Sequence, residues 1–141
     1  MAKNLIYNGN DELNRARVVP SGTLSGDPVI NVDRPAVAIT SRGDTISSTV
    51  VDGLTHQYRS GGFSNKAEEA TLAFDGTYEF DVTGVTASTG NQVKVYAVVD
   101  SGTGKVTALT TTASGNTLFG VTDYPNDYYK RAGIAPVRIG A

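Results

Sequence analysis

The chain has 141 residues, the length of one ordinary domain. Its 12 basic and 14 acidic residues give a formal net charge of −2, and only 18% of the residues are charged, which does not favour nucleic acid as a partner. There is no cysteine, so disulfides and thiolate metal sites are excluded. No stretch approaches the roughly 18 apolar residues of a membrane span, and no membrane partner is expected.

Residues 1–19 come first in the chain, and asparagine and glycine interrupt their apolar residues. They lack the continuous apolar stretch of a signal peptide, so we expect the chain to be made as a soluble protein. We predict that residues 1–19 are an N-terminal arm and that residues 20–141 are a single β domain.

Threonine, valine and 16 glycines dominate the chain, which favours strands and tight turns over helices. We predict an all-β fold, a small antiparallel β-barrel or sandwich with long loops and at most a short helical turn. Strands are expected at 29–32, 36–40, 45–51 and 70–74. Between the last two, residues 52–69 contain three glycines and show no alternation, which predicts a long loop with a helical turn capped by Ser64.

The clearest strand is TYEFDVT at 77–83, where Tyr78, Phe80 and Val82 share one face. Residues 92–99 alternate in the same way, and VTALTTT at 106–112 is the expected returning strand of a hairpin. Gly102 and Gly104 can supply the positive φ that its turn requires. Further strands are expected at 117–122 and 134–139.

Between those last strands, DYPNDYYKRAG at 123–133 gathers three tyrosines with Lys130 and Arg131. Tyrosine and arginine together are typical of protein interfaces. The alternative is a set of tyrosines folded over the barrel's own end, with their hydroxyls reaching water. Both alternatives stay open at this point.

The order SGDPV, PAVAIT, ATLAFDG in the first half is loosely mirrored by GNQV, TLFGVT, AGIAPVRIG in the second. We interpret this as a degenerate duplication with half-repeats at about 20–84 and 85–141. Two half-sheets of this kind could close on each other and cover most strand edges.

Groups for catalysis are few. His56 is the only histidine, and no serine lies in a G-x-S-x-G turn that would support a triad with it. Glu79 and Asp81 project from one strand face, which is more typical of a solvated face than of a catalytic pair. SGTGK lacks the earlier glycine of a phosphate loop. We predict no enzyme activity, no cofactor and no metal site.

Several motifs in order resemble one family. They are the MAKN start, SGDPV, ATLAFDGTYEF, GNQVKVY, GKVT, GNTLFGVT and APVRIG. Together, from about residue 20 to the end, they resemble the small capsid cement, or head decoration, proteins of tailed phages and prophages. The resemblance implies a non-enzymatic virion protein, made in the cytoplasm of the bacterial host and located on the outer capsid surface. It also implies a homotrimer at three-fold positions, bound to the phage major capsid protein, that stabilises the assembled shell.

Under this hypothesis, capsid docking falls to the N-terminal arm, with Leu5, Ile6 and Tyr7 adding as an edge strand and Arg15 and Arg17 pairing with acidic groups. The alternatives for the arm are a first strand of the domain's own sheet or a disordered tail. The two predicted loops supply the trimer-interface candidates His56, Tyr58, Arg59, Phe63, Tyr124, Tyr128, Tyr129 and Arg131.

A competing hypothesis is a carbohydrate-binding β module. Its sugar-stacking residues would be the tyrosines at 58, 96, 124, 128 and 129. An enzyme using His56 or the Glu79 and Asp81 pair is the third and weakest option.

Overall fold

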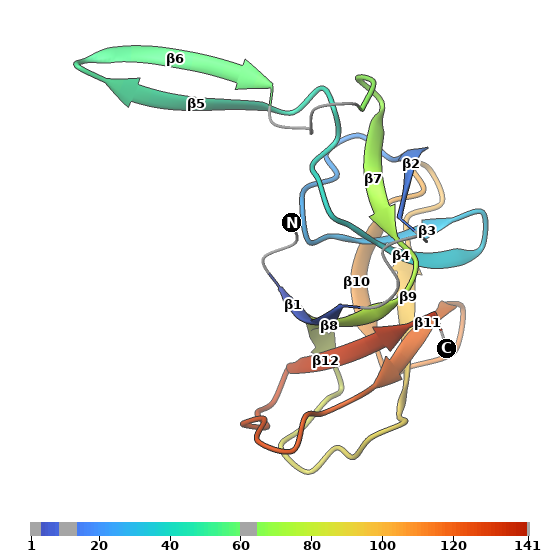
Figure 1. The fold of residues 1–141 in the computed structure, drawn as a ribbon. Helices are drawn as coiled ribbons and strands as arrows, with labels where there is room; N and C mark the ends of the chain where they lie inside the picture. The colour runs from blue at the N-terminus through green and yellow to red at the C-terminus, as the bar shows by residue number, and fades with distance from the viewer. Residues whose placement is uncertain (1–3, 9–13, 60–64, 141) are drawn as a thin grey trace.

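The computed structural model describes residues 4–8, 14–59 and 65–140. Across these ranges the chain forms strands and turns and no helix, which confirms the all-β prediction. The described part of the chain therefore offers no helix for crossing a membrane. Figure 1 shows three parts: a barrel, a four-stranded sheet beside it, and a two-stranded hairpin that projects away from both.

The barrel has five strands: β8 (Gly76–Thr83), β9 (Lys94–Val99), β10 (Val106–Thr110), β11 (Thr117–Thr122) and β12 (Ile134–Ile139). Their order is β8-β10-β9-β11-β12, and β12 pairs back onto β8 to close the sheet. Every pairing in this ring is antiparallel except β8 with β10, which is parallel. The predicted antiparallel barrel is confirmed, with one parallel pairing where β10 rather than β9 lies next to β8.

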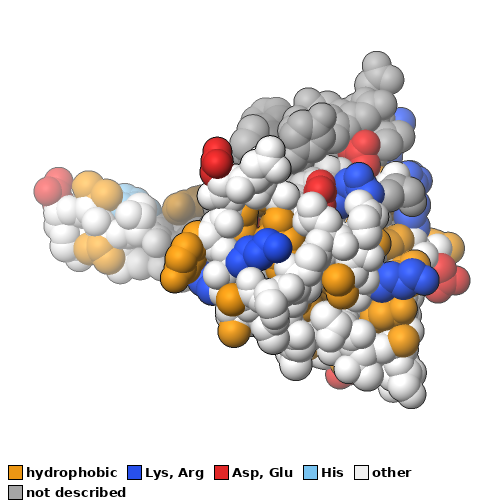
Figure 2. Space-filling view, turned by 90° about the horizontal axis from the view of Figure 1, so that it is seen from below, with side chains coloured by type: hydrophobic (Ala, Val, Ile, Leu, Met, Phe, Trp, Pro, Cys, Tyr) orange, Lys and Arg blue, Asp and Glu red, His pale blue; other side chains and the backbone are white. Residues whose placement is uncertain are grey.

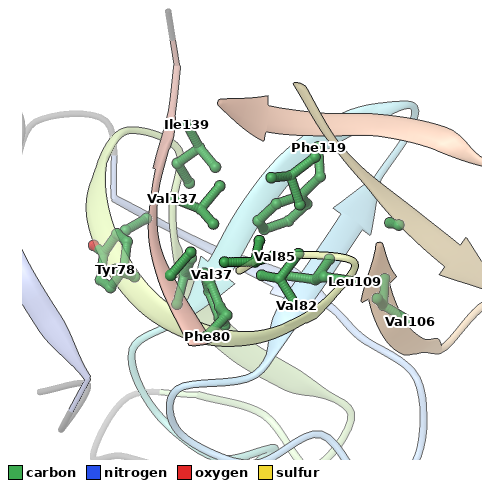
Figure 3. Packing of buried hydrophobic residues seen from close by; sticks show 14 of the residues in the cluster. Val37, Tyr78, Phe80, Val82, Val85, Val106, Leu109, Phe119, Val137 and Ile139 are labelled. Carbon is green, nitrogen blue, oxygen red and sulfur yellow. The ribbon is translucent and has the colours of Figure 1, made fainter. Parts of the chain in front are cut away.

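The interior of the barrel follows the alternation in the sequence. Tyr78, Phe80 and Val82 are buried on β8, as predicted, and Val95 and Ala97 are buried on β9. Figure 3 shows these β8 side chains packed with residues from the other barrel strands. Phe119 of β11 meets the Phe80 ring edge-on, with a centroid distance of 5.6 Å. Closure removes strand edges, and the apolar interior is shielded from water.

The predicted β9–β10 hairpin is confirmed, and its turn is built around Asp100. The Asp100 carboxylate accepts hydrogen bonds from the backbone N–H groups of Gly102 and Thr103. Gly104 has a φ of 75°, whereas Gly102 is not in the positive-φ region. Only one of the two glycines therefore meets the predicted conformational requirement.

The four-stranded sheet has the order β2-β7-β4-β3, all antiparallel. Its strands are β2 (Arg15–Val18), β7 (Glu69–Ala73), β4 (Arg34–Ala38) and β3 (Pro28–Asn31). Val37 of β4 belongs to the barrel's hydrophobic cluster, whereas Ala36 and Ala38 belong to a second cluster on the opposite face. Both faces of β4 are therefore covered, and this strand joins the sheet to the barrel.

The N-terminal residues lie in the protein's own sheets. β1 (Leu5–Asn8) pairs antiparallel with β8, and β2 pairs with β7. For these described residues, the pairings fit the alternative of ordinary strands, whereas the division of the chain at residue 19 stays a prediction. β8, placed in the first half-repeat, lies in the barrel with all the strands of the second half. The sheets thus divide the chain differently from the two half-repeats, and the duplication itself stays a prediction.

Candidate interaction surface

The projecting hairpin consists of β5 (Ile46–Val51) and β6 (Leu54–Arg59), which pair along their whole length. Asp52 and Gly53 form its turn with φ values of 52° and 77°. Two successive positive φ values are the signature of a type I′ turn, whose twist matches that of the two strands. We call residues 46–59 the arm; this segment is distinct from the N-terminal arm predicted over residues 1–19.

The long loop predicted over 52–69 is wrong for residues 54–59, because they form β6. The signal for this strand was present in the Asp52-Gly53 pair, which is a strong hairpin signal when strands flank it. Here the flanking alternation is weak, since apolar residues occur on both faces of the arm. Ser64 and Phe63, named for the helical turn and the interface, lie outside the described residues.

The arm has two distinct faces, set by its register. Directly paired residues of antiparallel strands project to the same side. One face carries Val51 with Leu54, Thr49 with His56, and Ser47 with Tyr58. The opposite face carries Val50 with Thr55, Ser48 with Gln57, and Ile46 with Arg59. The first face, which we call the aromatic face, therefore brings two predicted interface residues, His56 and Tyr58, onto one surface.

The arm makes little contact with the rest of the described protein. All its strand residues except Ser47 are exposed, and Leu54 and Tyr58 keep 65% and 54% of their surface in water. Figure 2 shows hydrophobic side chains spread along the arm, away from the body of the molecule. At its base, the Arg59 Nε donates a 2.9 Å hydrogen bond to the Gly43 carbonyl oxygen. An isolated two-stranded hairpin is marginally stable in water, so a partner that covered it would stabilise it.

The second predicted interface, at 123–131, is organised differently. The Tyr124 and Tyr128 rings meet edge-on at 5.5 Å, and Tyr124 is buried. Lys130 Nζ lies 4.6 Å from the centre of the Tyr124 ring and donates a 2.9 Å hydrogen bond to the Thr89 carbonyl oxygen. Tyr124 and Tyr128 thus fold over the barrel's own end, as the second of the two sequence alternatives proposed, whereas Tyr129 is 78% exposed.

Tyr128 and Glu79 form the polar link in this cluster. The Tyr128 hydroxyl donates a 2.5 Å hydrogen bond to Glu79 Oε2, and Arg131 Nη2 lies 3.8 Å from Glu79 Oε1. Three effects raise the pKa of Tyr128 from 10.0 to about 12: burial is the largest, followed by the hydrogen bond to Glu79 and by the negative charge of that carboxylate. The positive charge of Arg131 opposes them. Burial also raises the pKa of Tyr124.

The Tyr128→Phe variant is expected to lose part of the alkaline sensitivity of folding. Because the folded-state pKa of Tyr128 lies above its ordinary value, the contribution of the neutral phenol is complete below pH 10 and is lost as the pH rises through about 12. The substitution should lower the free energy of unfolding by about 1 kcal/mol at neutral pH. Between pH 10 and 12, the stability of the variant should fall less than that of the wild type. Thermal unfolding at a series of pH values measures this, with Tyr129→Phe as the exposed control. Equal alkaline slopes for wild type and Tyr128→Phe would contradict the assignment.

The two sets of interface candidates do not meet. In Figure 1 the arm and the 123–131 loop lie at opposite ends of the molecule, with the four-stranded sheet and barrel between them. Within one chain they therefore form two surfaces, and the arm is by far the more exposed.

The capsid-docking candidates are also separated. Ile6 is exposed on β1, beside the barrel, whereas Arg15 and Arg17 are exposed on β2, the edge of the other sheet. Arg15 pairs with Leu72 and Arg17 with Ala70, so both arginines lie on the sheet face that carries the second hydrophobic cluster. Charges placed this way on an edge strand oppose pairing with another chain. Of the side chains of Leu5 and Tyr7 nothing is described.

The groups considered for catalysis do not converge. His56 lies on the arm, Glu79 is engaged by Tyr128, and Asp81 is exposed on β8. Across residues 4–8, 14–59 and 65–140, no three His, Asp or Glu side chains gather in a way that could hold a metal ion. Among the described residues, the arm is the segment that leaves the most large apolar side chains exposed.

Comparison of the sequence with protein-family models, with curated proteins and with solved structures gives no significant match.

Proposed function

We propose that this chain is a non-enzymatic decoration protein that binds the exterior of an assembled phage head. It binds as a homotrimer at three-fold positions, with the major capsid protein as its partner. The phage assignment rests on the resemblance in the ordered motifs from SGDPV at 25–29 to APVRIG at 135–140. The mode of attachment rests on the arm, whose residues His56, Tyr58 and Arg59, predicted from the sequence for the trimer interface, are here proposed for docking instead.

The observation that carries the proposal is the exposure of the arm. Val51, Leu54 and Tyr58 on the aromatic face are all more than half exposed, although they are residues that gain free energy from burial. Both outer edges of the hairpin also present backbone donors and acceptors beyond the single β5–β6 ladder. A partner can therefore add a strand to an edge and cover the aromatic face in the same contact.

Several weak contacts are enough for this role. A trimer presents three arms, so attachment to a shell gains avidity beyond each single contact. A protein that binds the lattice but not its separated subunits stabilises the lattice by mass action. The gain is about 2.7 kcal/mol when its concentration is 100 times its dissociation constant.

The tyrosines named for a carbohydrate-binding module do not form a shared platform. Tyr58 lies on the arm, Tyr124 is buried, and Tyr129 lies in the loop at the other end of the molecule. Stacking on a sugar needs rings that face one concave surface, so this function has less support from the geometry than docking does.

The test is to mix the purified protein with expanded, undecorated shells of the phage that encodes it. Extra cryo-EM density at the three-fold positions and cosedimentation with the shells are expected. Because the arm carries only Asp52 and Arg59 as charged residues, binding should change little between low and high salt. Absence of binding to the shells would reject the proposal, and binding to a glycan array instead would favour the carbohydrate module.

A further inference from the structure

A cavity of about 540 Å³ lies where the start of β4 meets β11 and the end of β12. Its lining includes the apolar residues Phe74, Leu118, Phe119 and Ile139, of which only Leu118 is substantially exposed. A volume of this size falls in the range of small-ligand sites. None of the arm residues lines it.

Three cationic side chains border this cavity: Arg34, Lys94 and Arg138. Only one acidic residue, Asp33, lines it as well. This local excess of positive charge contrasts with the whole chain, whose formal net charge is −2. Positive groups attract an anion, and the apolar walls of the cavity strengthen that attraction because they limit the anion's exposure to water.

The strand register places two of the cations on the same face of the sheet, two strands apart. Lys94 of β9 pairs with Val121 of β11, and Val121 pairs with Arg138 of β12. Residues paired directly across strands project from the same face, so Lys94 and Arg138 flank Val121 on the outside of the barrel. Both cations therefore stand on rigid barrel strands rather than on loops.

The third cation, Arg34, stacks on the aromatic ring of Phe74. The Arg34 guanidinium carbon lies 4.4 Å from the centre of the Phe74 ring, and Phe74 is buried. A guanidinium stacked on an aromatic face keeps its edge available for hydrogen bonding to a planar anion. Arg34 thus covers the apolar side of the cavity and still presents donors.

Arg138 has an unused buried donor. Its Nε is buried and has no hydrogen-bond partner in the described part of the chain. Within the described residues, the Arg138 side chain donates one long hydrogen bond, from Nη2 to Gln92 Oε1 at 3.4 Å. A buried donor without an acceptor is costly, but this Nε has no surface that a ligand could contact. An oxyanion in the cavity would therefore be held by the terminal nitrogens of the Arg138 guanidinium.

We propose that this cavity binds a small organic anion, with its carboxylate or phosphate group held by Arg138, Lys94 and Arg34. The apolar part of the ligand lies against Leu118, which is 49% exposed. The proposal is independent of shell binding, because the arm takes no part in it.

Amide NMR titrations with four probes test the site: phenyl phosphate, phenylacetate, benzyl alcohol and inorganic phosphate. We expect phenyl phosphate or phenylacetate to shift the amides of Lys94, Leu118 and Arg138 with a dissociation constant below about 1 mM. Neutral benzyl alcohol and inorganic phosphate should each bind at least about tenfold more weakly, since each lacks one half of the recognition. Whichever of phenyl phosphate and phenylacetate binds more tightly shows whether the site prefers a phosphate or a carboxylate.

Variants separate the site from general charge attraction. Arg138→Gln and Lys94→Gln should each weaken binding about tenfold or more, Arg138→Lys should retain part of it, and Arg17→Gln on β2 should leave it unchanged. Thermal unfolding of each variant shows that the fold is kept. The proposal is overturned if neither anion shifts these amides at about 10 mM, if benzyl alcohol binds as tightly, or if Arg17→Gln weakens binding as much as Arg138→Gln does.

Discussion

Excision of the arm is expected to abolish attachment to shells while leaving the rest of the protein folded. Ile46 and Arg59 pair directly at the base of the hairpin, so Ser47–Tyr58 can be replaced by Asn-Gly without moving the flanking chain. No arm residue belongs to either hydrophobic cluster of the described protein. The free energy of unfolding should therefore change by less than about 1 kcal/mol, whereas affinity for shells should fall about 100-fold or more.

A second variant distinguishes the contribution of the arm's side chains to shell binding from that of its backbone edges. Replacing Val51, Leu54 and Tyr58 by serine keeps the hairpin's outer edges and removes the apolar part of the aromatic face. If this triple variant binds like the excised protein, the aromatic face carries the contact; if it binds like wild type, strand addition does. Unchanged shell binding by the excised protein would show that another surface docks, and the N-terminal candidates Ile6, Arg15 and Arg17 would then be tested first.

Replacing Phe119 by alanine is expected to give the largest loss of stability. Phe119 is only 1% exposed and packs its ring against Phe80 inside the closed barrel. Buried Phe→Ala changes cost about 3–5 kcal/mol, because the ring's burial is lost and a cavity remains. The total free energy of unfolding of a domain of this size is about 5–15 kcal/mol, so the variant should unfold on modest warming.

Urea denaturation measures this loss directly, and the neighbouring residue provides the control. Leu118 lies on the same strand but is 49% exposed, so Leu118→Ala should cost less than about 1 kcal/mol. Similar losses for Phe119→Ala and Leu118→Ala would mean that the barrel interior is not packed as described.

The arm shows why sequence reasoning failed where it did. Alternation identifies a strand when one face is buried and the other is wet, as in Tyr78, Phe80 and Val82. Residues 54–59 are exposed on both faces, so no such difference shaped their sequence, and only Asp52-Gly53 marked the turn. Likewise, the tyrosines at 124 and 128 left interface and self-packing equally open, because ring and hydroxyl suit both settings.

The sequence by itself determined the all-β class, the faces of β8 and β9, and the β9–β10 hairpin, because these depend on residues close together in the chain. Only the tertiary structure decided which distant strands pair: β1 with β8, β2 with β7, and β10 parallel to β8. It also decided that residues 46–59 project while Tyr124 is buried. An alternating pattern specifies which side of a strand is covered but not by what, since most apolar surfaces of suitable size can cover it.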